Sequence, residues 1–375
     1  MKHIYLDIHA LQTVPPSNIN RDDTGSPKTA IYGGVRRARV SSQSWKRAIR
    51  QEFARHLDAT QLGIRTKRLV EVVSQHIRDL SPELEPSATE LAVAAIEAGG
   101  FKVDVSKTKD GEGAGKPAQT SYLLFVSNVQ ARRLAELAIE AFRKGEKLDK
   151  KQVKAALNSD HSVDVALFGR MIADSADLNV DASTQVAHAI SVHAVETEFD
   201  YFTAVDDKNT EEESGAGMIG TVEFNSSTLY RYATVNLRGL AQNLGDSDVT
   251  VKAVVSFVRS FVESMPTGKQ NTFANRTLPD AVVVTVRNRM PVNLVGAFEE
   301  AVTAEKGKSR LRVAAERLAQ HSADLEAGYG NSAVRTLVVA PTSSVAPLVS
   351  LGEQVSLDDL LLALESDLHA WLEEA

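Results

Sequence analysis

The densest positive charge in the chain lies in GGVRRARVSSQSWKRAIR, residues 33–50, which holds six arginine and lysine residues and no acidic one. Ser41 or Ser42 is suited to cap a helix that begins there. Three cations then share one arc near the start of that helix, namely Lys46, Arg47 and Arg50. Free backbone N–H groups, serine hydroxyls and cationic side chains at a helix N-terminus bind phosphate well. We therefore expect this segment, called the basic block below, to hold a phosphodiester backbone.

The rest of the chain is acidic, which makes the basic block an exception. The 375 residues carry a formal net charge of −7. Residues 24–51 contain seven basic side chains and no acidic one, leaving 35 of the 42 basic residues against all 49 acidic ones elsewhere, a balance of −14. A polyanion would be repelled by most of this surface and admitted at one place. The alternative is that the block is only a solvated basic face.

Composition excludes several classes of protein. With 43% apolar and 24% charged residues, the chain has the make-up of an ordinary globular protein. It has no cysteine, which excludes disulfides, thiolate metal sites and a cysteine nucleophile, and suits a reducing cytoplasm. Charge interrupts the start, MKHIYLDIHAL, where a signal peptide is apolar, and no stretch is long enough to span a membrane. We expect a soluble, cytoplasmic protein with no membrane partner.

Periodicity predicts the elements that position the basic block. Alternating apolar residues over positions 4–11 predict a first strand. The segment 12–34 is rich in proline, glycine, asparagine and aspartate, and predicts a long loop. Apolar residues at helical spacing in SSQSWKRAIRQEFARHL predict the helix that carries the block. Between about residues 60 and 180, helical patterns surround a glycine-rich stretch, residues 106–121, that predicts a mobile loop. We interpret this region as a helical insertion.

Strand patterns return after residue 181. QVAHAISVHAV (185–195) and TLYRYATVNL (228–237) alternate, and the stretch of about thirty residues between them is far longer than a hairpin turn. We expect this excursion to be an arm that exposes Tyr201 and Phe202. The alternative is that these rings pack the arm onto the sheet as a small satellite core.

The remaining patterns complete the fold class. Five elements and one loop follow in order: a helix at 250–265, a polar basic loop (PTGKQNTFANR, 266–276), a strand at 280–288, a helix to about residue 328, a strand at 335–341 and an acidic C-terminal helix. The order strand, helix, strand, strand, helix, strand, with long insertions, predicts an α+β protein with a ferredoxin-like sheet. RNA-recognition modules use the same plan.

The common catalytic motifs do not occur in the sequence. The Gly-Lys-Ser at Gly307 lacks the glycine that a Walker A motif needs five residues earlier, where Val302 stands. His9 could act as a general base, and Asp22 with Asp23 could position a water or a divalent ion beside a phosphate. The stronger interpretations are a histidine that is packed or exposed without a catalytic role, and a turn in which aspartate bonds its own backbone. We expect no catalytic residue, no metal and no cofactor.

Beyond these patterns, the chain resembles one known family. IHALQTVPPSNINRDDTGSPKTAIYGGVRRARVSSQSWKRAIR (8–50) is similar to the N-terminal signature of the backbone subunit of the type I-E CRISPR Cascade complex, the CasC family of the RAMP superfamily. Further segments resemble the family in the same order: VDVALFGRM (163–171), STQVAHAISVHAVETEFDYFTAVDD (183–207), LYRYATVNL, the GKQNTFA loop and AGYGN near residue 330. The resemblance covers nearly the whole chain.

The resemblance implies a protein shaped like a hand. A modified RNA-recognition sheet would form the palm from residues 1–59, 181–195 and 225–375, with helical fingers at 60–180 and a thumb at 196–224. Copies would stack head to tail along the spacer of a CRISPR RNA, together with other Cascade subunits. Each thumb would displace a base at regular intervals, so that the guide can pair with target DNA. The subunit itself would not be a nuclease.

The basic block and the resemblance together give one set of predicted RNA-binding residues. The NRDD and SSQSxKR motifs and their neighbours contribute Arg21, Lys28, Ser41, Ser42, Gln43, Lys46, Arg47 and Arg50. The wedge around a displaced base would consist of Met171, Tyr201, Phe202 and Thr203. The GKQNTFA loop adds Lys269 and Gln270.

Two rival interpretations stay open. The first is a RAMP-type ribonuclease that cuts RNA through Asp22, Asp23 or His9, which incubation with labelled RNA would reveal. The second is a structural assembly protein whose basic block meets an acidic partner. The RNA content of the purified protein separates that rival from an RNA-binding subunit.

Overall fold

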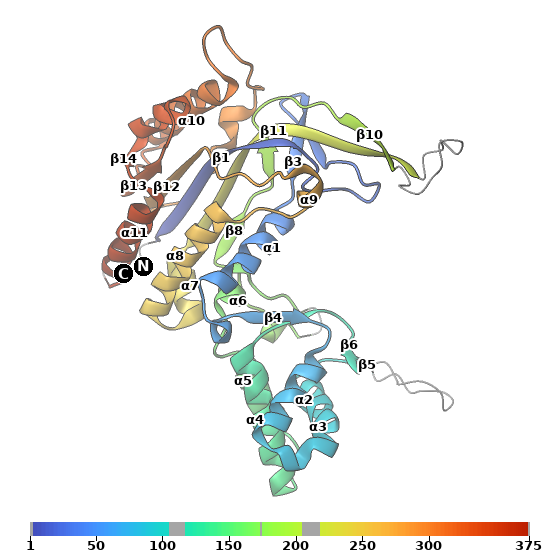
Figure 1. Ribbon diagram of the computed structural model, residues 1–375. Helices are drawn as coiled ribbons and strands as arrows, with labels where there is room; N and C mark the ends of the chain where they lie inside the picture. The colour runs from blue at the N-terminus through green and yellow to red at the C-terminus, as the bar shows by residue number, and fades with distance from the viewer. Residues whose placement is uncertain (1–2, 105–116, 173–174, 205–217, 374–375) are drawn as a thin grey trace, which may run out of the picture. The chain divides into compact units, whose positions relative to one another are not determined.

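The structure is a computed structural model that describes residues 3–104, 117–172, 175–204 and 218–373. The chain divides into two compact units, whose elements are labelled in Figure 1. The first unit comprises Met1–Glu52, Gln185–Leu237 and Val254–Ala375, and the second comprises Phe53–Thr184 and Arg238–Ala253. Most of the loop predicted at residues 106–121 lies outside the described residues.

The first unit is built on a ten-stranded sheet. Eight strands follow one another in the order β14-β13-β12-β1-β11-β9-β3-β2, and β8 and β10 pair with β11. The strands are β1 (Tyr5–Ser17), β2 (Thr29–Tyr32), β3 (Val35–Val40), β8 (Thr184–Val186), β9 (Ala189–Ser191), β10 (Glu198–Ala204), β11 (Met218–Asn236), β12 (Ala281–Arg287), β13 (Arg335–Val339) and β14 (Glu353–Gln354). The helical segments that accompany them are α1 (Ser42–Glu52), α8 (Ser247–Glu263), α9 (Gln270–Phe273), η5 (Leu294–Phe298), α10 (Arg310–Tyr329), η6 (Ser343–Leu351) and α11 (Leu357–Glu373).

The centre of this sheet has ferredoxin-like topology, which confirms the predicted fold class. Four strands lie side by side in the order β12-β1-β11-β9, and each neighbouring pair is antiparallel. Along the chain, α1 comes between β1 and β9, and α8 comes between β11 and β12. This is the split βαβ arrangement, in which each crossover lays a helix on the sheet.

Both faces of the central strands are buried. Along β11 the side chains alternate between the two faces of the sheet, as the sequence predicted. Tyr230 faces the cluster built by α10, η5 and η6. Its neighbours face the other way, where Leu229 belongs to the same hydrophobic cluster as Trp45 of α1 and Arg231 stacks over the Trp45 ring. Trp45 is almost completely buried. The core beneath α1 therefore fixes the helix that carries the basic block.

The first strand is longer than the sequence predicted. β1 runs to Ser17 and includes Pro15 and Pro16, which were assigned to a loop. Its pairing register with β11 shifts between Val14 and Ser17. Proline cannot donate to a strand ladder and is tolerated at such a bulge. Because β2 and β3 also form a hairpin, the prediction of one loop over residues 12–34 was wrong.

The strand predicted at residues 185–195 is broken in two. β8 and β9 are each three residues long, with a gap between them. At the end of β9, the Ser191 hydroxyl donates to the carbonyl oxygen of His193 at 2.6 Å and accepts the N–H of Ala38 at 3.0 Å. Such side-chain bonds compete with a regular strand ladder, and alternation of residue types does not reveal them.

The second unit is mainly helical. Its helices include α2 (Leu69–Leu80), α3 (Ala88–Ala98), α4 (Asn128–Lys144), α5 (Lys150–Leu157), α6 (Val163–Phe168) and α7 (Leu237–Leu244). Two short strand pairs accompany them: β4 (Gly63–Thr66) with β7 (Leu124–Ser127), and β5 (Val103–Asp104) with β6 (Gln119–Thr120). The sequence predicted a helical insertion between about residues 60 and 180, and the strand β4 within it was not predicted. None of the helices in the described part of the chain is long and apolar enough to cross a membrane.

Candidate nucleic-acid interface

The basic block reaches the N-terminus of α1, where Ser41 is the capping residue. The Ser44 N–H donates to Ser41 Oγ at 3.3 Å, and the Trp45 N–H donates to the Ser41 carbonyl oxygen at 3.2 Å. Ser41 is buried, and its own N–H donates to the side-chain oxygen of Asn20 at 2.8 Å. The structure thus gives Ser41 a capping role beneath the surface, and its direct contact with RNA stays a prediction.

His188 also supports the first turn of α1, although the sequence analysis did not select it. Its Nδ1 accepts the N–H of Ser42 at 3.2 Å, and the Arg39 guanidinium lies 3.4 Å from the same atom. An accepting Nδ1 requires a neutral ring. Partial burial lowers the pKa of His188, and the charges of Arg39 and Lys28 lower it further. His188 lies in the gap between β8 and β9. The alternating sequence pattern predicted a continuous strand there and gave no sign of this gap.

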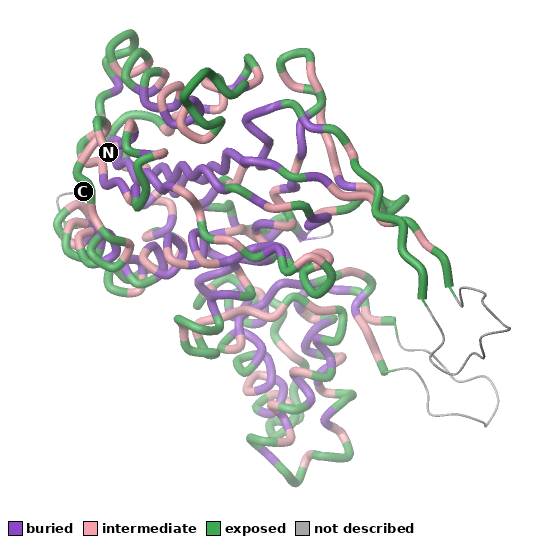
Figure 2. Tube along the Cα trace, turned by 45° about the horizontal axis from the view of Figure 1, so that its top comes forward, coloured by how far each residue is buried: buried purple, intermediate pink, exposed green. Residues whose placement is uncertain are grey.

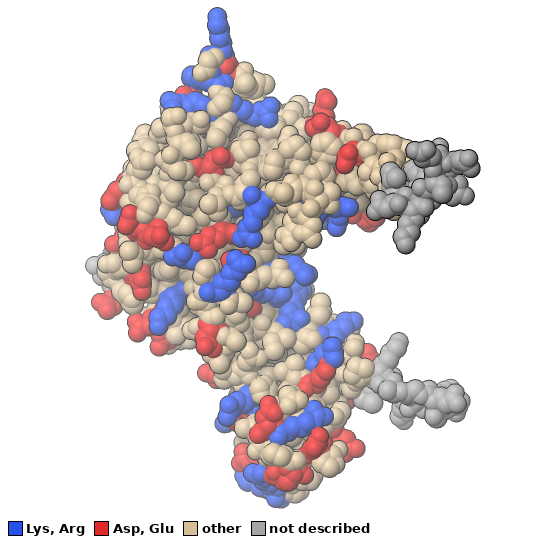
Figure 3. Space-filling view, viewed as in Figure 1, with Lys and Arg blue, Asp and Glu red and all other residues tan. Residues whose placement is uncertain are grey.

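Beyond Ser41, the α1 part of the basic block presents cations toward solvent. Gln43 and Arg47 are exposed, and Ser42, Lys46 and Arg50 are half-buried. Burial lowers the pKa of Lys46, because its ammonium group is partly withdrawn from water. Figure 3 shows Lys and Arg side chains gathered over α1. Cations in this arrangement can hold phosphate oxygens without reading bases, while the first-turn N–H groups of Ser42, Ser44 and Trp45 already donate within the protein.

The segment before β2 lies beside the start of α1. The Asn20 carbonyl oxygen accepts the N–H of Lys28 at 2.9 Å, and the Lys28 carbonyl oxygen accepts the N–H of Arg39 at 2.9 Å. Because Asn20 also bonds Ser41, this segment is tied to the helix cap. Lys28 is half-buried and Arg21 is exposed. The structure therefore places Arg21 and Lys28, both predicted to bind RNA, close to the basic block.

Asp22 forms a turn, as the sequence favoured. Its Oδ1 accepts the hydroxyl of Thr24 at 2.7 Å and the backbone N–H groups of Thr24 and Ser26, both at 3.0 Å. The Thr24 hydroxyl and these N–H groups hold the pKa of Asp22 below its usual value. Asp23 is exposed beside it. Oδ1 of Asp22 is therefore committed to the turn.

Arg37 does not belong to the predicted phosphate-binding surface, although the charge count included it. It is fully buried on β3. Its guanidinium donates to the carbonyl oxygens of Tyr32 at 3.2 Å, Ser191 at 3.0 Å, Phe298 at 2.9 Å and Glu299 at 3.0 Å. One of the seven charges in residues 24–51 thus serves the fold by satisfying buried carbonyl groups.

Lys269 and Gln270 lie in a loop that packs against the chain just before Arg21. A side chain at Gly268 would place its Cβ 2.3 Å from the Ile19 carbonyl oxygen, so only glycine fits there. Lys269 follows with a φ of 51°, in the left-handed region that few non-glycine residues adopt, and is half-buried. Gln270 is exposed at the start of α9.

β10 and the outer part of β11 form the predicted arm. They pair antiparallel from Glu198 opposite Phe224 to Ala204 opposite Met218. Every residue of β10 is exposed, as Figure 2 shows for the outer strands. The alternative that these rings pack onto the sheet as a satellite core is therefore wrong.

The four predicted wedge residues have different surroundings. Phe202 lies opposite Gly220, where a Cβ would stand 2.4 Å from its ring, so the ring folds across its own arm. Tyr201 is 64% exposed, against 37% for Phe202. Because side chains alternate along a strand, Tyr201 and Thr203 lie on the face of the arm opposite to Phe202. Met171 belongs to the second unit and is 87% exposed. Its grouping with the arm stays a prediction from the resemblance.

Asn18 connects the arm to the Asp22 turn, and the sequence analysis did not select it. The residue is buried, and its Nδ2 donates to the carbonyl oxygens of Gly25 and Glu223, both at 2.9 Å. Gly25 belongs to the Asp22 turn and Glu223 to the base of the arm. One amide group therefore fixes the arm relative to the turn.

Arg231 is a second buried connection, this time beneath α1. Its guanidinium lies 3.7 Å from the centre of the Trp45 ring and 4.3 Å from that of Phe261. It donates to Gln12 Oε1 at 2.6 Å, and Gln12 Nε2 donates to the Thr277 carbonyl oxygen at 2.8 Å. Burial lowers the pKa of Arg231 to about 9. This network links α1 to the end of the Lys269 loop.

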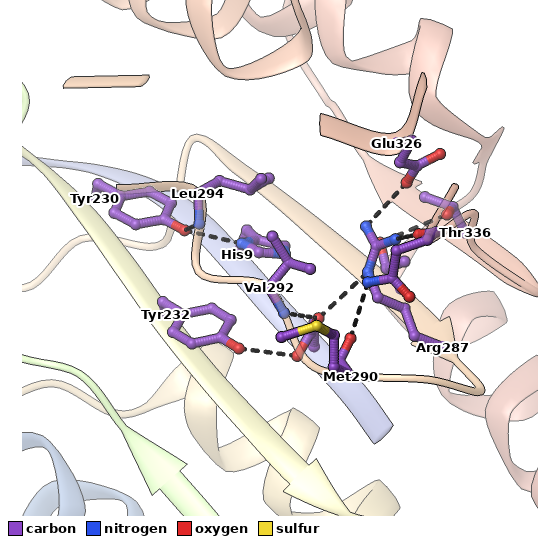
Figure 4. A network of polar contacts seen from close by, with 12 residues as sticks. His9, Tyr230, Tyr232, Arg287, Met290, Val292, Leu294, Glu326 and Thr336 are labelled. Atoms are coloured by element: carbon purple, nitrogen blue, oxygen red, sulfur yellow. Dashed lines mark hydrogen bonds and ion pairs between the residues drawn. The ribbon is translucent and has the colours of Figure 1, made fainter. Parts of the chain in front are cut away.

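His9 lies in a buried polar network, which excludes it as a surface base (Figure 4). Its Nδ1 is 2.9 Å from the Tyr230 hydroxyl, and its ring stacks on Tyr232. The Tyr232 hydroxyl donates to Asp7 Oδ1 at 2.9 Å, and Arg287 Nε lies 3.4 Å from Asp7 Oδ2. Burial, with a smaller effect of the Arg287 charge, lowers the pKa of His9 to about 3. A histidine held there cannot reach a phosphodiester at the surface.

Comparison with known proteins places the chain in a family. A sequence model of the family described as CT1975-like protein matches residues 6–363. One solved structure, described as a CRISPR RNA-guided surveillance complex, pre-nicking, contains a chain that is 36% identical with a TM-score of 0.82, covering 96% of this chain and all of that one. A second, described as a CRISPR RNA-guided surveillance complex, is 31% identical with a TM-score of 0.71, covering 96% and 99%. No curated protein matches the chain. Because the family match spans most of its length, the chain belongs to the CT1975-like protein family.

Proposed function

We propose that this chain is a CRISPR RNA-binding backbone subunit of a Cascade-type surveillance complex, of type I-E. The observation that carries the proposal is the basic block on the first turns of α1, where Lys46 and Arg47 stand in a chain of net charge −7. Such a site offers cations to phosphates and no pattern of donors that would distinguish bases. The likeness to chains of RNA-guided surveillance complexes supports the same function.

Holding RNA by its backbone leaves the base edges free to pair with target DNA, which carries the sequence recognition. In this proposal the exposed arm crosses the RNA and, with Met171, wedges against a displaced base. Copies of the chain stack head to tail along the guide, which requires two different surfaces of the chain to meet in an interface that does not close. Other Cascade subunits complete the assembly, in the cytoplasm. The chain acts in antiviral defence without catalysing a reaction.

The direct test of this function is the RNA that the protein carries. The chain, expressed with a CRISPR array and purified at moderate salt, should show an absorbance ratio typical of a ribonucleoprotein and yield RNA of one length that contains spacer sequence. The variant Lys46→Ala/Arg47→Ala should carry less of this RNA. A preparation free of RNA, in which the protein still assembles with other subunits, would favour the structural assembly protein instead.

A further inference from the structure

The backbone on both sides of His188 is anchored in the sheet of the first unit. The Ala187 N–H donates to the Tyr232 carbonyl oxygen at 2.9 Å, and Ala189 is paired with Val40. His188 itself is exposed between these two anchored residues. The structure thus presents the imidazole ring at a fixed place on the surface, beside the first turn of α1.

Two donors approach the same nitrogen of this ring, which determines where its proton lies. The Ser42 N–H donates to His188 Nδ1 at 3.2 Å, and Arg39 Nη1 lies 3.4 Å from the same atom. The Arg39 guanidinium is itself fixed, since its Nε donates to the Thr29 carbonyl oxygen at 3.2 Å. Arginine is a donor only and stays charged, so Nδ1 is the unprotonated nitrogen. The hydrogen bonds therefore assign the proton of the neutral ring to Nε2.

The Nε2–H group is a donor that the protein itself does not use. The two nitrogens of an imidazole point to opposite sides of the ring, so an Nδ1 that faces Ser42 directs Nε2–H away from Ser42. Within the described part of the chain, no residue accepts a hydrogen bond from His188 Nε2. Because the side chain is exposed, this N–H group is available to a ligand.

The surroundings of this donor favour an anion. Partial burial lowers the pKa of His188, and the charges of Arg39 and Lys28 lower it further. The groups that shift this pKa include no carboxylate. Arg39 of β3 and Lys28 before β2 thus surround the ring with positive charge, while Ser42 of α1 faces its Nδ1. A charged acceptor such as a phosphate oxygen makes a stronger hydrogen bond to this N–H than a neutral acceptor does.

We propose that His188 is a further RNA-binding residue, whose Nε2–H donates to a phosphate oxygen of the guide beside Lys28 and Arg39. This inference rests on the proposed function and adds one neutral contact to the cationic ones. A lysine or arginine contact makes the affinity depend on salt, because it releases counterions from the RNA. A neutral donor positions a phosphate without that dependence. One ring then has two roles, since Nδ1 supports α1 and Nε2 binds RNA.

Two substitutions in the full chain separate the two nitrogens. His188→Asn places an amide oxygen near the position of Nδ1, so the Ser42 N–H keeps an acceptor while the donor at Nε2 is lost. His188→Gln reaches the position of Nε2 with an amide N–H but leaves Ser42 without its acceptor. His188→Asn should weaken binding of a guide RNA about tenfold and keep the thermal midpoint of the parent. His188→Gln should lower the midpoint by about 2 °C and bind RNA more tightly than His188→Asn does.

Salt and pH report the charge of the contact. His188→Asn should leave the slope of log K against log salt unchanged, because it removes no cation. The ratio of the parent affinity to the His188→Asn affinity should stay constant between about pH 8 and about pH 7, where a ring with a lowered pKa is neutral. A slope that falls by about 0.7, with a ratio that grows as the pH drops, would show a contact by the charged ring and overturn the proposal. Parent-like affinity in His188→Asn, with weaker binding only in His188→Gln, would show that the ring only supports α1 and would overturn it too.

Failure of this inference is distinguishable from failure of the proposed function. If the parent protein binds no guide RNA, or if Lys46→Ala/Arg47→Ala leaves its affinity unchanged, the proposed function fails and the role of His188 fails with it. If the parent binds RNA and Lys46→Ala/Arg47→Ala weakens that binding while His188→Asn does not, only the role of His188 is wrong.

Discussion

Three arginines show why single residues were hard to assign from sequence. Arg37, Arg47 and Arg231 look alike in a charge count, but only Arg47 reaches solvent. Arg37 donates to carbonyl oxygens of segments that lie more than a hundred residues away along the chain. Arg231 donates to the carbonyl oxygen of Phe261 beneath a helix. No local sequence pattern predicts these contacts. Arg47 and Lys46 were predictable, because the apolar spacing of Trp45, Ala48 and Ile49 determines which side of α1 faces water.

The buried His9 predicts a dependence of stability on pH. The unfolded histidine has a pKa of 6.5 and the folded one about 3, so between these values the unfolded state binds a proton that the folded state does not. The free energy of unfolding should therefore fall as the pH drops below about 6.5. His9→Phe, which keeps a ring beside Tyr232, should reduce this slope by up to about 1.4 kcal/mol per pH unit. Urea unfolding at pH 6 and pH 5 measures it, with His3→Phe at an exposed position as control. An unchanged slope in His9→Phe would contradict the assignment.

The Asp22 turn predicts that no carboxylate there is catalytic. Asp22→Asn and Asp23→Asn keep a side-chain oxygen that can accept the turn hydrogen bonds while removing the charge. Both variants should bind RNA as the parent does, and neither parent nor variants should cut labelled RNA with or without Mg²⁺. Cleavage by the parent that either variant loses would establish the ribonuclease interpretation instead.

At the level of elements, periodicity located strands and helices but not their ends. The strand predicted over residues 4–11 is confirmed from Tyr5, yet β1 continues through Pro15 and Pro16, because a bulge removes the need for their missing N–H groups. The arm was predictable from its length alone. The anchoring of its base by Asn18 was not, since that hydrogen bond joins residues 205 positions apart.

The network beneath α1 predicts that Arg231 is hard to replace with another cation. Burial lowers the pKa of Arg231 to about 9, and its planar group stacks between Trp45 and Phe261. Lysine would keep a buried charge but lose the stacking and the fork of donors. Methionine would remove the charge and fill the apolar space. Arg231→Lys should therefore be the less stable variant in urea unfolding, by about 1 kcal/mol or more. Equal stability, or the reverse order, would show that the charge itself is what the site needs.

The arm should be separable from the sheet that carries it. Phe199 and Glu223 are opposed in β10 and β11, so deleting residues 200–222 and joining these two through a Gly-Asn turn closes a short hairpin and keeps the Asn18 hydrogen bond. The thermal midpoint should stay within a few degrees of the parent, because every deleted residue of β10 is exposed. On a guide RNA, the variant should lose the periodic reactivity of displaced bases, where stacking contributes about 1 to 3 kcal/mol per base. Full stacks with intact periodicity would contradict the thumb assignment.

At the scale of the whole molecule, the proposal combines RNA binding by the basic block with the stacking of copies through other surfaces. An acidic chain with one basic block repels RNA except along a line, and copies that stack head to tail would extend that line into a channel. This assembly was predicted from the resemblance to the Cascade backbone family and not from a physical pattern in the residues. The sequence of one chain does not show how many copies assemble. The fold class, in contrast, followed from the order of strands and helices alone.

The measurement that tests the account most directly is the salt dependence of RNA affinity for several unrelated guide sequences. Lys46→Ala/Arg47→Ala should weaken binding equally for every sequence, and the slope of log K against log salt should fall by about 0.7 for each phosphate that is no longer neutralised, or about 1.4 for two phosphates. A matched variant that removes two lysines elsewhere, Lys306→Ala/Lys308→Ala, should leave the slope near that of the parent. A slope unchanged by Lys46→Ala/Arg47→Ala, or a weakening of affinity that depends on the guide sequence, would contradict the claim that the basic block holds the RNA backbone.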